Sequence, residues 1–188
     1  MALAVKKEPF TYHDLDNFPE DGKRREIIGG ELFVAGGELF VSAAPSTRHQ
    51  RLIGEIFFLI RSFLQDKAVG TVFMAPTQVV FDELESVEPD IFLVLNEGRA
   101  EIVERRVLGA PAWIIEVLSP TNREYDLETK RKLYARYGVV YWVVDPEAEE
   151  ILTWDVEGKK VYSRGDLAEV SVLPGFGLEP TLLFDAVT

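Results

Sequence analysis

The stretch AWIIEVL at residues 112–118 decides the fold of this 188-residue chain, because it is apolar except for one acidic residue, Glu116. A run this apolar is typical of a strand that is covered on both faces of a sheet. A second run of the same kind, IFLV at residues 91–94, directly follows Asp90. The two runs therefore predict a buried central sheet with a carboxylate at or near one end of each strand.

Strand and helix patterns alternate around these two runs. Further strands are predicted near residues 26–34, 38–43, 69–74, 78–81 and 139–144, and a hairpin over residues 151–154 and 161–163. After an irregular or helical opening at residues 12–20, helices are predicted over residues 47–66, capped by Ser46 or Thr47, and over residues 125–137, ended by Gly138. The order predicts an α/β fold in which helices flank a central mixed β-sheet.

The length and composition predict one domain over residues 1–188. Hydrophobic residues make up 47% of the chain, which is enough for a sizeable core, and no linker rich in Pro, Gly or Ser divides it. No run reaches the roughly 18 apolar residues of a membrane span, and no secretory pattern opens the chain. We therefore expect a soluble, cytoplasmic protein without a membrane partner.

The chain contains no cysteine, which excludes disulfides, thiolate zinc sites and cysteine nucleophiles. With only His13 and His49 as imidazole ligands, a bound metal ion must be held mainly by oxygen atoms. Oxygen ligands favour Mg²⁺ or Mn²⁺ over zinc.

The formal net charge of -12 argues against nucleic-acid binding, because contacts to phosphates dominate the affinity of such proteins. The positive charge is unevenly spread, however. The cluster Arg123, Lys130, Arg131, Lys132 and Arg136 leaves room for a local basic face on an acidic protein.

Asp90 and Glu116 are the candidate metal ligands. Asp90 follows Pro89 at the start of a buried strand, and its alternative role is that of an ordinary turn residue. Glu116 interrupts a buried run, where an unpaired carboxylate costs several kcal/mol, so it needs a metal ion, a cation or hydrogen-bond donors. Its structural alternative is a buried ion pair with an arginine.

Helical periodicity separates two lysines in the predicted helix that follows Glu116. At about 100° per residue, Lys130 lies on the apolar stripe with Leu127 and Tyr134, whereas Lys132 lies on the opposite side and is expected to face solvent. Lys130 can also form an ion pair with Asp126 one turn earlier.

Two carboxylates and a lysine at the edge of a sheet suit the cleavage of phosphodiesters. The carboxylates hold one or two divalent ions, and the ammonium offsets the charge that develops on phosphorus. Asp90, Glu116 and Lys130 are therefore the predicted centre of the active site.

The ordered segments EPDIFLV, PAWIIEVLSPTNREYDLETKRKLYARYGV and YWVVDP resemble the Uma-type restriction endonuclease family, a bacterial branch of the PD-(D/E)XK nuclease superfamily. The preceding GELFVSAAPSTRHQRLIG is also similar to that family, so the resemblance covers most of residues 26–145. It implies a restriction-endonuclease-like fold, dependence on a divalent metal ion and DNA as substrate. It also implies that Asp90 is the motif aspartate and Glu116 the second acid.

The chain departs from the superfamily pattern at Leu118, where a lysine usually stands two residues after the second acid. The resemblance suggests that the lysine has migrated to the following helix, in the D-x-x-x-K-x-x-x-Y stretch that contains Lys130. The septets GGELFVA and GGELFVS at residues 29–35 and 36–42 duplicate a strand, so Glu26, Glu31 and Glu38 all compete as the family's N-terminal glutamate. We favour Glu26.

Three further residues complete the sequence-based hypotheses. His49 lies in the first turn of the long helix, where it either contacts a phosphate or a water molecule or packs at the start of the helix. Tyr134 and Trp142 are expected in the core.

The sequence therefore favours a magnesium-dependent DNA endonuclease, which is expected to be a homodimer because cutting two strands requires two sites. The alternatives are a nucleic-acid-binding or partner-binding module on a nuclease fold and a metal-dependent hydrolase of a substrate other than nucleic acid.

Overall fold

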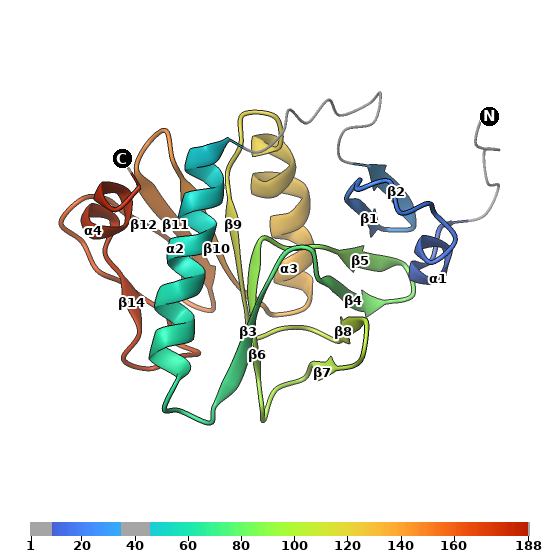
Figure 1. Ribbon diagram of the computed structural model, residues 1–188, viewed down its shortest axis with the longest axis horizontal. Coiled ribbons are helices and arrows are strands. Elements are labelled where there is room, and N and C mark those ends of the chain that lie inside the picture. Colours follow the sequence, from blue (N-terminus) through green and yellow to red (C-terminus); the bar gives the residue numbers. More distant parts are fainter. Residues whose placement is uncertain (1–8, 35–45, 188) are drawn as a thin grey trace.

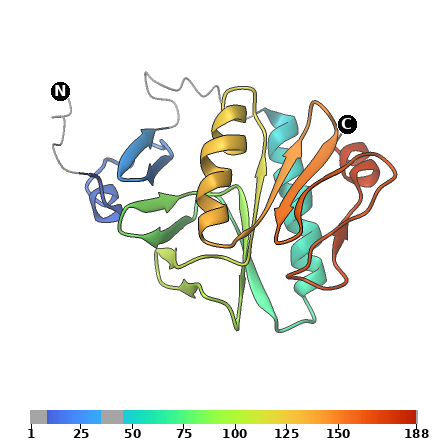
Figure 2. The same ribbon diagram turned by 180° about the vertical axis from the view of Figure 1, so that it is seen from behind.

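Two six-stranded sheets and a pair of helical layers make up the fold of this computed structural model, which describes residues 9–34 and 46–187 (Figure 1). The larger sheet lies between helix α2 on one face and the helical segment η1 and α3 on the other (Figure 2). The smaller sheet extends to one side, on the right in Figure 1. The predicted α/β class with a mixed sheet and flanking helices is confirmed, although the strands form two large sheets.

The larger sheet contains both of the apolar runs. Its strand order is β12-β11-β10-β9-β6-β3, with β3 at Gly70–Met74, β6 at Ile91–Leu95, β9 at Trp113–Val117, β10 at Val140–Asp145, β11 at Glu150–Asp155 and β12 at Gly158–Tyr162. β9 and β10 are parallel and all other pairs in this sheet are antiparallel. The crossover from β9 to β10 is helical, as parallel neighbours require.

The side chains of β9 alternate between the two faces of this sheet. Trp113, Ile115 and Val117 pack in the cluster that α2 covers, whereas Ile114 packs in the cluster that α3 covers. Because strand side chains alternate, Glu116 lies on the α3 face with Ile114. Every residue of β9 is buried, as the apolar run predicted.

The smaller sheet has the order β2-β1-β5-β4-β8-β7. Its strands are β1 at Arg25–Ile28, β2 at Glu31–Val34, β4 at Gln78–Asp82, β5 at Glu85–Val87, β7 at Glu101–Ile102 and β8 at Arg106–Leu108. The region predicted as strand over residues 26–34 is thus a hairpin, because Gly29 and Gly30 adopt positive φ angles of 61° and 75° and turn the chain. β5, β7 and β8 were not predicted. The strand predicted near residues 38–43 lies outside the described residues.

Helix α2 spans Thr47–Leu64, and the Ser46 side chain caps it by accepting from the backbone N–H of His49. The second predicted helix is not α-helical throughout. Residues Tyr125–Lys130 form a π-helix, η1, and only Arg131–Arg136 form the α-helix α3. The prediction of one α-helix over residues 125–137 is therefore wrong for its first half.

Small elements lie at the two ends of the described chain. A short helix, α1, spans Tyr12–Leu15, within the opening at residues 12–20 that was predicted to be irregular or helical. Near the C-terminus, where no element was predicted, Ala168–Glu169 and Gly177–Leu178 pair as β13 and β14 before helix α4 at Pro180–Asp185. Phe176, Leu183 and Phe184 from this region join the core under α2. No helix in residues 9–34 or 46–187 is long and apolar enough to cross a membrane.

The position of Ile115 leads to a stability prediction. Its side chain is fully buried between β9 and α2, so Ile115→Ala should lower the free energy of unfolding by about 2–5 kcal/mol. Val161→Ala on the edge strand β12, where the side chain is 47% exposed, should change it by less than about 0.5 kcal/mol. Urea unfolding followed by circular dichroism measures both, and equal losses would contradict the placement of Ile115 in the core.

Candidate active site

Asp90 and Glu116 lie side by side because β6 and β9 are antiparallel neighbours, which places the start of β6 beside the end of β9. The Asp90 backbone N–H donates to Glu116 Oε2 over 3.2 Å, and the Val117 N–H donates to Asp90 Oδ2 over 3.0 Å. Both side chains are almost fully buried. The register of two strands thus fixes the two candidate metal ligands relative to each other.

Lys130 joins three carboxylates from three different elements. Its Nζ lies 2.9 Å from Glu116 Oε1, 3.2 Å from Glu26 Oε1 and 3.4 Å from Asp126 Oδ1. The lysine residue is 2% exposed, whereas the Lys132 side chain is 69% exposed and pairs with Glu128. The predicted orientations of the two lysines are confirmed. The cation that pairs with Glu116 is this lysine, so the predicted alternative of an arginine is wrong.

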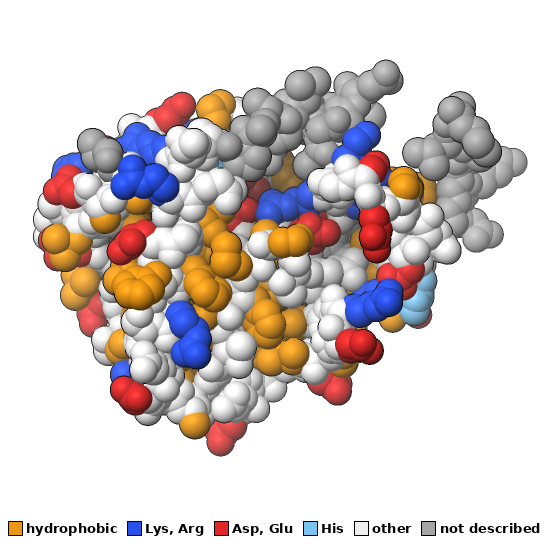
Figure 3. Space-filling view, viewed as in Figure 1, with side chains coloured by type: hydrophobic (Ala, Val, Ile, Leu, Met, Phe, Trp, Pro, Cys, Tyr) orange, Lys and Arg blue, Asp and Glu red, His pale blue; other side chains and the backbone are white. Residues whose placement is uncertain are grey.

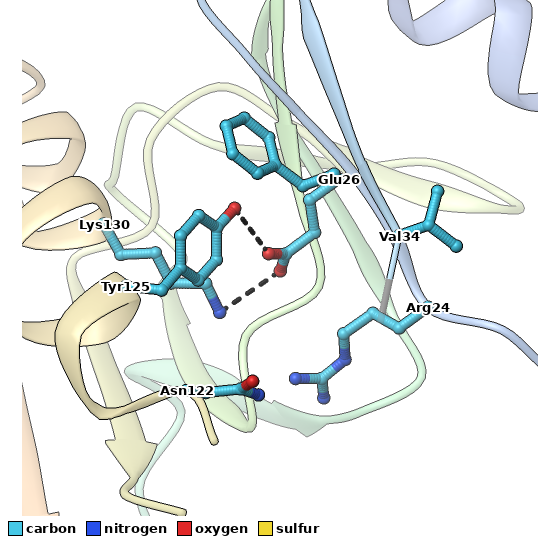
Figure 4. Close-up of a pocket in the computed structure, with 7 residues that line it drawn as sticks. Arg24, Glu26, Val34, Asn122, Tyr125 and Lys130 are labelled. Atoms are coloured by element: carbon cyan, nitrogen blue, oxygen red, sulfur yellow. Dashed lines mark hydrogen bonds and ion pairs between the residues drawn. The ribbon is translucent and has the colours of Figure 1, made fainter. Parts of the chain in front are cut away.

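Glu26 on β1 is the acid that the hairpin contributes. Its Oε1 accepts from Lys130 and from the Glu88 backbone N–H, and its Oε2 accepts from the Tyr125 hydroxyl over 3.0 Å (Figure 4). Glu31 is exposed, and Glu38 lies outside the described residues. The structure therefore brings Glu26 into the candidate site.

His49 reaches the same acids from the first turn of α2. Its Nε2 donates to the Val117 carbonyl over 2.9 Å and lies 3.5 Å from Asp90 Oδ2. Its Nδ1 is buried and has no hydrogen-bond partner among the described residues. Burial alone would lower the pKa of His49, but the contact with Asp90 raises it overall.

Tyr134 and Trp142 are core residues, as predicted, with at most 1% of either residue exposed. Tyr134 has a second contact that periodicity did not indicate, because its hydroxyl donates to Glu116 Oε1 over 3.1 Å. Arg24 was not predicted as a site residue, yet its Nη2 lies 3.1 Å from Asp90 Oδ1. The available signal was its spacing of two from Glu26, which puts both side chains on the same side of an extended segment.

Buried negative charge is in excess at the site. Glu26, Asp90, Glu116 and Asp126 are each at most 4% exposed. Among the residues that the structure describes, the permanent cations in contact with them are Lys130 and Arg24. Four carboxylates thus face two fixed positive charges, and they remain in excess even when His49 is protonated. A buried charge imbalance of this kind is costly unless protons or a metal ion offset it.

The pKa values of these buried acids diverge because burial and charged partners affect each of them differently. Burial opposes the ionisation of Asp90, but the His49 contact and the nearby Arg24 charge hold its pKa well below the usual range. Burial raises the pKa of Glu116 to about 8, against the opposing effect of Lys130, and raises the pKa of Asp126 to about 6. Adjacent carboxylates with widely separated pKa values are characteristic of functional sites.

A cleft of about 680 Å³ opens onto these residues, with Arg24, His49, Asp90, Glu116 and Asp126 among its lining residues. A second pocket of about 30 Å³, enough for a water molecule or two, lies beside it between the β1–β2 hairpin and η1 (Figure 4). Arg24 lines both spaces. The candidate site is therefore buried on the Lys130 side and open on the Asp90 side.

The donor set suits a magnesium-like ion with few protein ligands. No group of three or more acidic or histidine side chains with metal-binding geometry occurs in residues 9–34 and 46–187. Mg²⁺, however, is commonly held by one or two carboxylates and keeps several waters. Asp90 Oδ1 and Glu116 Oε2 each accept one hydrogen bond from the described residues, which leaves each one lone pair. The two acids thus fit such an ion.

The predicted basic cluster does not present free positive charge. Four of its members have carboxylate partners: Arg123 pairs with Asp145, Arg131 and Lys132 both pair with Glu128, and Arg136 pairs with Glu85. Lys130 is buried, so the five cations form no common surface. On the opposite side of the molecule, over α2, Lys and Arg lie among acidic and apolar side chains (Figure 3).

The raised pKa of Glu116 predicts how stability depends on pH in the presence of chelator. The pKa of its carboxyl is about 8 in the folded protein, against 4.5 for an unperturbed glutamate. The contribution of this proton to the free energy of unfolding is therefore complete below about pH 4.5 and is lost as the pH rises toward 8. Relative to Glu116→Gln, the wild type should lose stability across this window. Urea unfolding at pH 5 and pH 8 measures the effect, with Glu128→Gln on the exposed side of η1 as control. Parallel profiles for wild type and Glu116→Gln would refute it.

Comparison with known proteins agrees with this fold. A crystal structure from Anabaena variabilis, described as a "putative nuclease belonging to DUF820", matches with a TM-score of 0.78 and 20% sequence identity, over 96% of this chain and 100% of that one. No curated protein sequence matches the chain. The profile of the family Uma2, described as "Putative restriction endonuclease", matches residues 11–181. Because that match covers most of the sequence, the chain belongs to the Uma2 family.

Proposed function

We propose that this protein is a divalent-metal-dependent endonuclease that hydrolyses phosphodiester bonds in DNA. The observation that carries the proposal is the excess of buried carboxylates over fixed cations at a cleft, with unused lone pairs on Asp90 and Glu116. The family description, which names restriction endonucleases, supports DNA as the substrate.

Asp90 and Glu116 would hold Mg²⁺ or Mn²⁺, because their oxygens suit these ions and face the cleft. When bound, such an ion polarises a phosphoryl oxygen and lowers the pKa of water. Hydrolysis forms one bond between a water oxygen and phosphorus and breaks one phosphorus–oxygen ester bond. The water gives up a proton and the departing oxygen gains one, so the products are a phosphomonoester and an alcohol.

Lys130 organises the acids of this site. Its ammonium bridges Glu26, Glu116 and Asp126. Its charge favours the ionised forms of Glu116 and Asp126, and metal binding requires an ionised carboxylate. Its charge acts on the reacting phosphate through a poorly screened interior. His49 has a positioning role, since it lies against Asp90 and donates to the Val117 carbonyl.

The acidic character of the chain favours one alternative, a metal-dependent hydrolase whose substrate is not a nucleic acid. A net charge of -12 and the pairing of the basic cluster give little long-range attraction for DNA. Salt titration separates the alternatives, because DNA held through phosphate contacts dissociates steeply as salt rises.

Manganese binding tests the metal site. Asp90→Ala and Glu116→Ala, with the isosteric variants Asp90→Asn and Glu116→Gln, should abolish binding in calorimetric titration, because each removes one of the two proposed ligands. Glu147→Ala should leave it intact, since this exposed acid lines the same cleft away from the buried carboxylates. Undiminished binding in folded Asp90 and Glu116 variants would exclude these residues as ligands.

Plasmid cleavage tests the activity and the two lysines together. With Mg²⁺ or Mn²⁺ at low salt, supercoiled plasmid should become nicked and then linear, the second step being expected of a homodimer, and chelator should stop both. Lys130→Ala should lower the rate about 100-fold or more, whereas Lys132→Ala should have little effect. Thermal unfolding confirms that each variant is folded at the assay temperature.

Equal losses in the two lysine variants would contradict the role of Lys130. A wild-type protein that is inert over the full range of metals and salt would instead favour the binding module predicted as an alternative.

A further inference from the structure

Arg24 places a partly exposed guanidinium at the meeting point of the cleft and the small pocket. Its Nη2 lies 3.1 Å from Asp90 Oδ1 and its Nε lies 3.8 Å from Glu88 Oε2. The side chain is still 26% exposed despite these two partners. Figure 4 shows it extending from the hairpin into the pocket, with Asn122 across from it.

The guanidinium has donors to spare. An arginine carries five N–H groups, and among the described residues one hydrogen bond uses Nη2 while the Nε contact is an ion pair too long for a hydrogen bond. No described residue accepts a hydrogen bond from Nη1. Because the side chain is partly exposed and lines the cleft, its two Nη1–H groups are available to a ligand there.

Lys130 cannot offer donors in the same way. Its three ammonium protons face the three carboxylates that surround it, and the residue is 2% exposed. Contact between its ammonium and a substrate phosphate would break at least one buried ion pair. The two cations of the site thus have different surroundings. Lys130 is enclosed by carboxylates, whereas Arg24 lines the cleft that a substrate would enter.

We propose that Arg24 is a catalytic residue that binds the non-bridging oxygens of the scissile phosphate. This inference rests on the proposed function and assigns the direct phosphate contact to Arg24. Lys130 then acts on the negative charge of the phosphate at longer range, because three carboxylates surround its ammonium. A planar guanidinium matches the paired oxygens of a phosphate, and Asp90 and Glu88 hold it aimed at the cleft. A preorganised donor at this position stabilises the charge that develops during displacement at phosphorus.

The contact between Arg24 and Asp90 means that manganese affinity can distinguish a phosphate-binding role of Arg24 from a role in holding Asp90 in place. Arg24 and a divalent cation would both bind the Asp90 carboxylate, and their positive charges repel each other. Removal of the Arg24 charge should therefore leave manganese affinity unchanged or increase it. If Arg24 merely held Asp90 in place, its removal would weaken manganese binding together with activity.

The test compares wild type with Arg24→Gln, Arg24→Lys and Arg25→Gln in manganese calorimetry and in plasmid cleavage with Mn²⁺. Arg24→Gln should cleave about 100-fold to 1000-fold more slowly and bind manganese at least as tightly as wild type. Arg24→Lys keeps the charge without the planar fork, so it should recover part of the rate. Arg25→Gln should match wild type, because Arg25 pairs with Asp21, lies over the Phe18 ring and does not line the cleft.

Four outcomes would overturn the inference. Full cleavage by Arg24→Gln would remove Arg24 from the reaction, and a parallel loss of manganese affinity would make it a support for Asp90. Equal losses in Arg24→Gln and Arg25→Gln would show a general effect of charge. A wild-type protein that cleaves no plasmid would refute the proposed function itself, and this inference with it.

Discussion

The ammonium of Lys130 is the interaction on which the arrangement of the site depends. It ties Glu26 of the small sheet, Glu116 of the large sheet and Asp126 of the π-helix to one point. Each of these acids would be costly to bury alone, and together they would repel one another. A single buried cation makes their convergence tolerable, and in doing so it fixes how the hairpin, the central strand and the crossover helix meet.

That arrangement serves the chemistry of the site better than its stability. Well-packed apolar residues would fill the same space at lower cost, because charges that are taken out of water are only partly compensated by their partners. The four acids remain in excess over the fixed cations of the described residues. Burial raises the pKa of Glu116, whereas the contacts with His49 and Arg24 hold the pKa of Asp90 low. Such an excess is useful where a cation is to be bound, since the ion relieves a repulsion that the fold already contains.

The electrostatics of the whole molecule differ from those of the cleft. Long-range attraction of a polyanion is weak for a chain of net charge -12 whose basic cluster is paired with carboxylates. Under the proposed function, affinity for a phosphodiester would arise locally, from a bound metal ion and from cationic groups that line the cleft, such as Arg24. This division makes ionic strength and metal concentration the governing variables of any nucleic-acid binding.

The local sequence pattern was sufficient to predict the burial or orientation of a residue wherever these depend on its neighbours in the chain. The apolar run around Glu116 predicted a strand buried on both faces, and helical spacing predicted that Lys130 faces inward and Lys132 outward, even though η1 is a π-helix. Position i+4 stays on nearly the same side in either helix type, which is why that prediction survived. The Asp126–Lys130 contact was foreseeable for the same reason.

The sequence by itself thus determined the buried strands, the mixed α/β class and two of the buried acids, Asp90 and Glu116. The tertiary structure alone decided that Glu26 and not Glu31 joins them, that Arg24 meets Asp90, and that Tyr125 donates to Glu26. The last two contacts join residues 66 and 99 positions apart. Their formation depends on how the hairpin packs against the larger sheet, and no periodicity within a strand or helix carries that information.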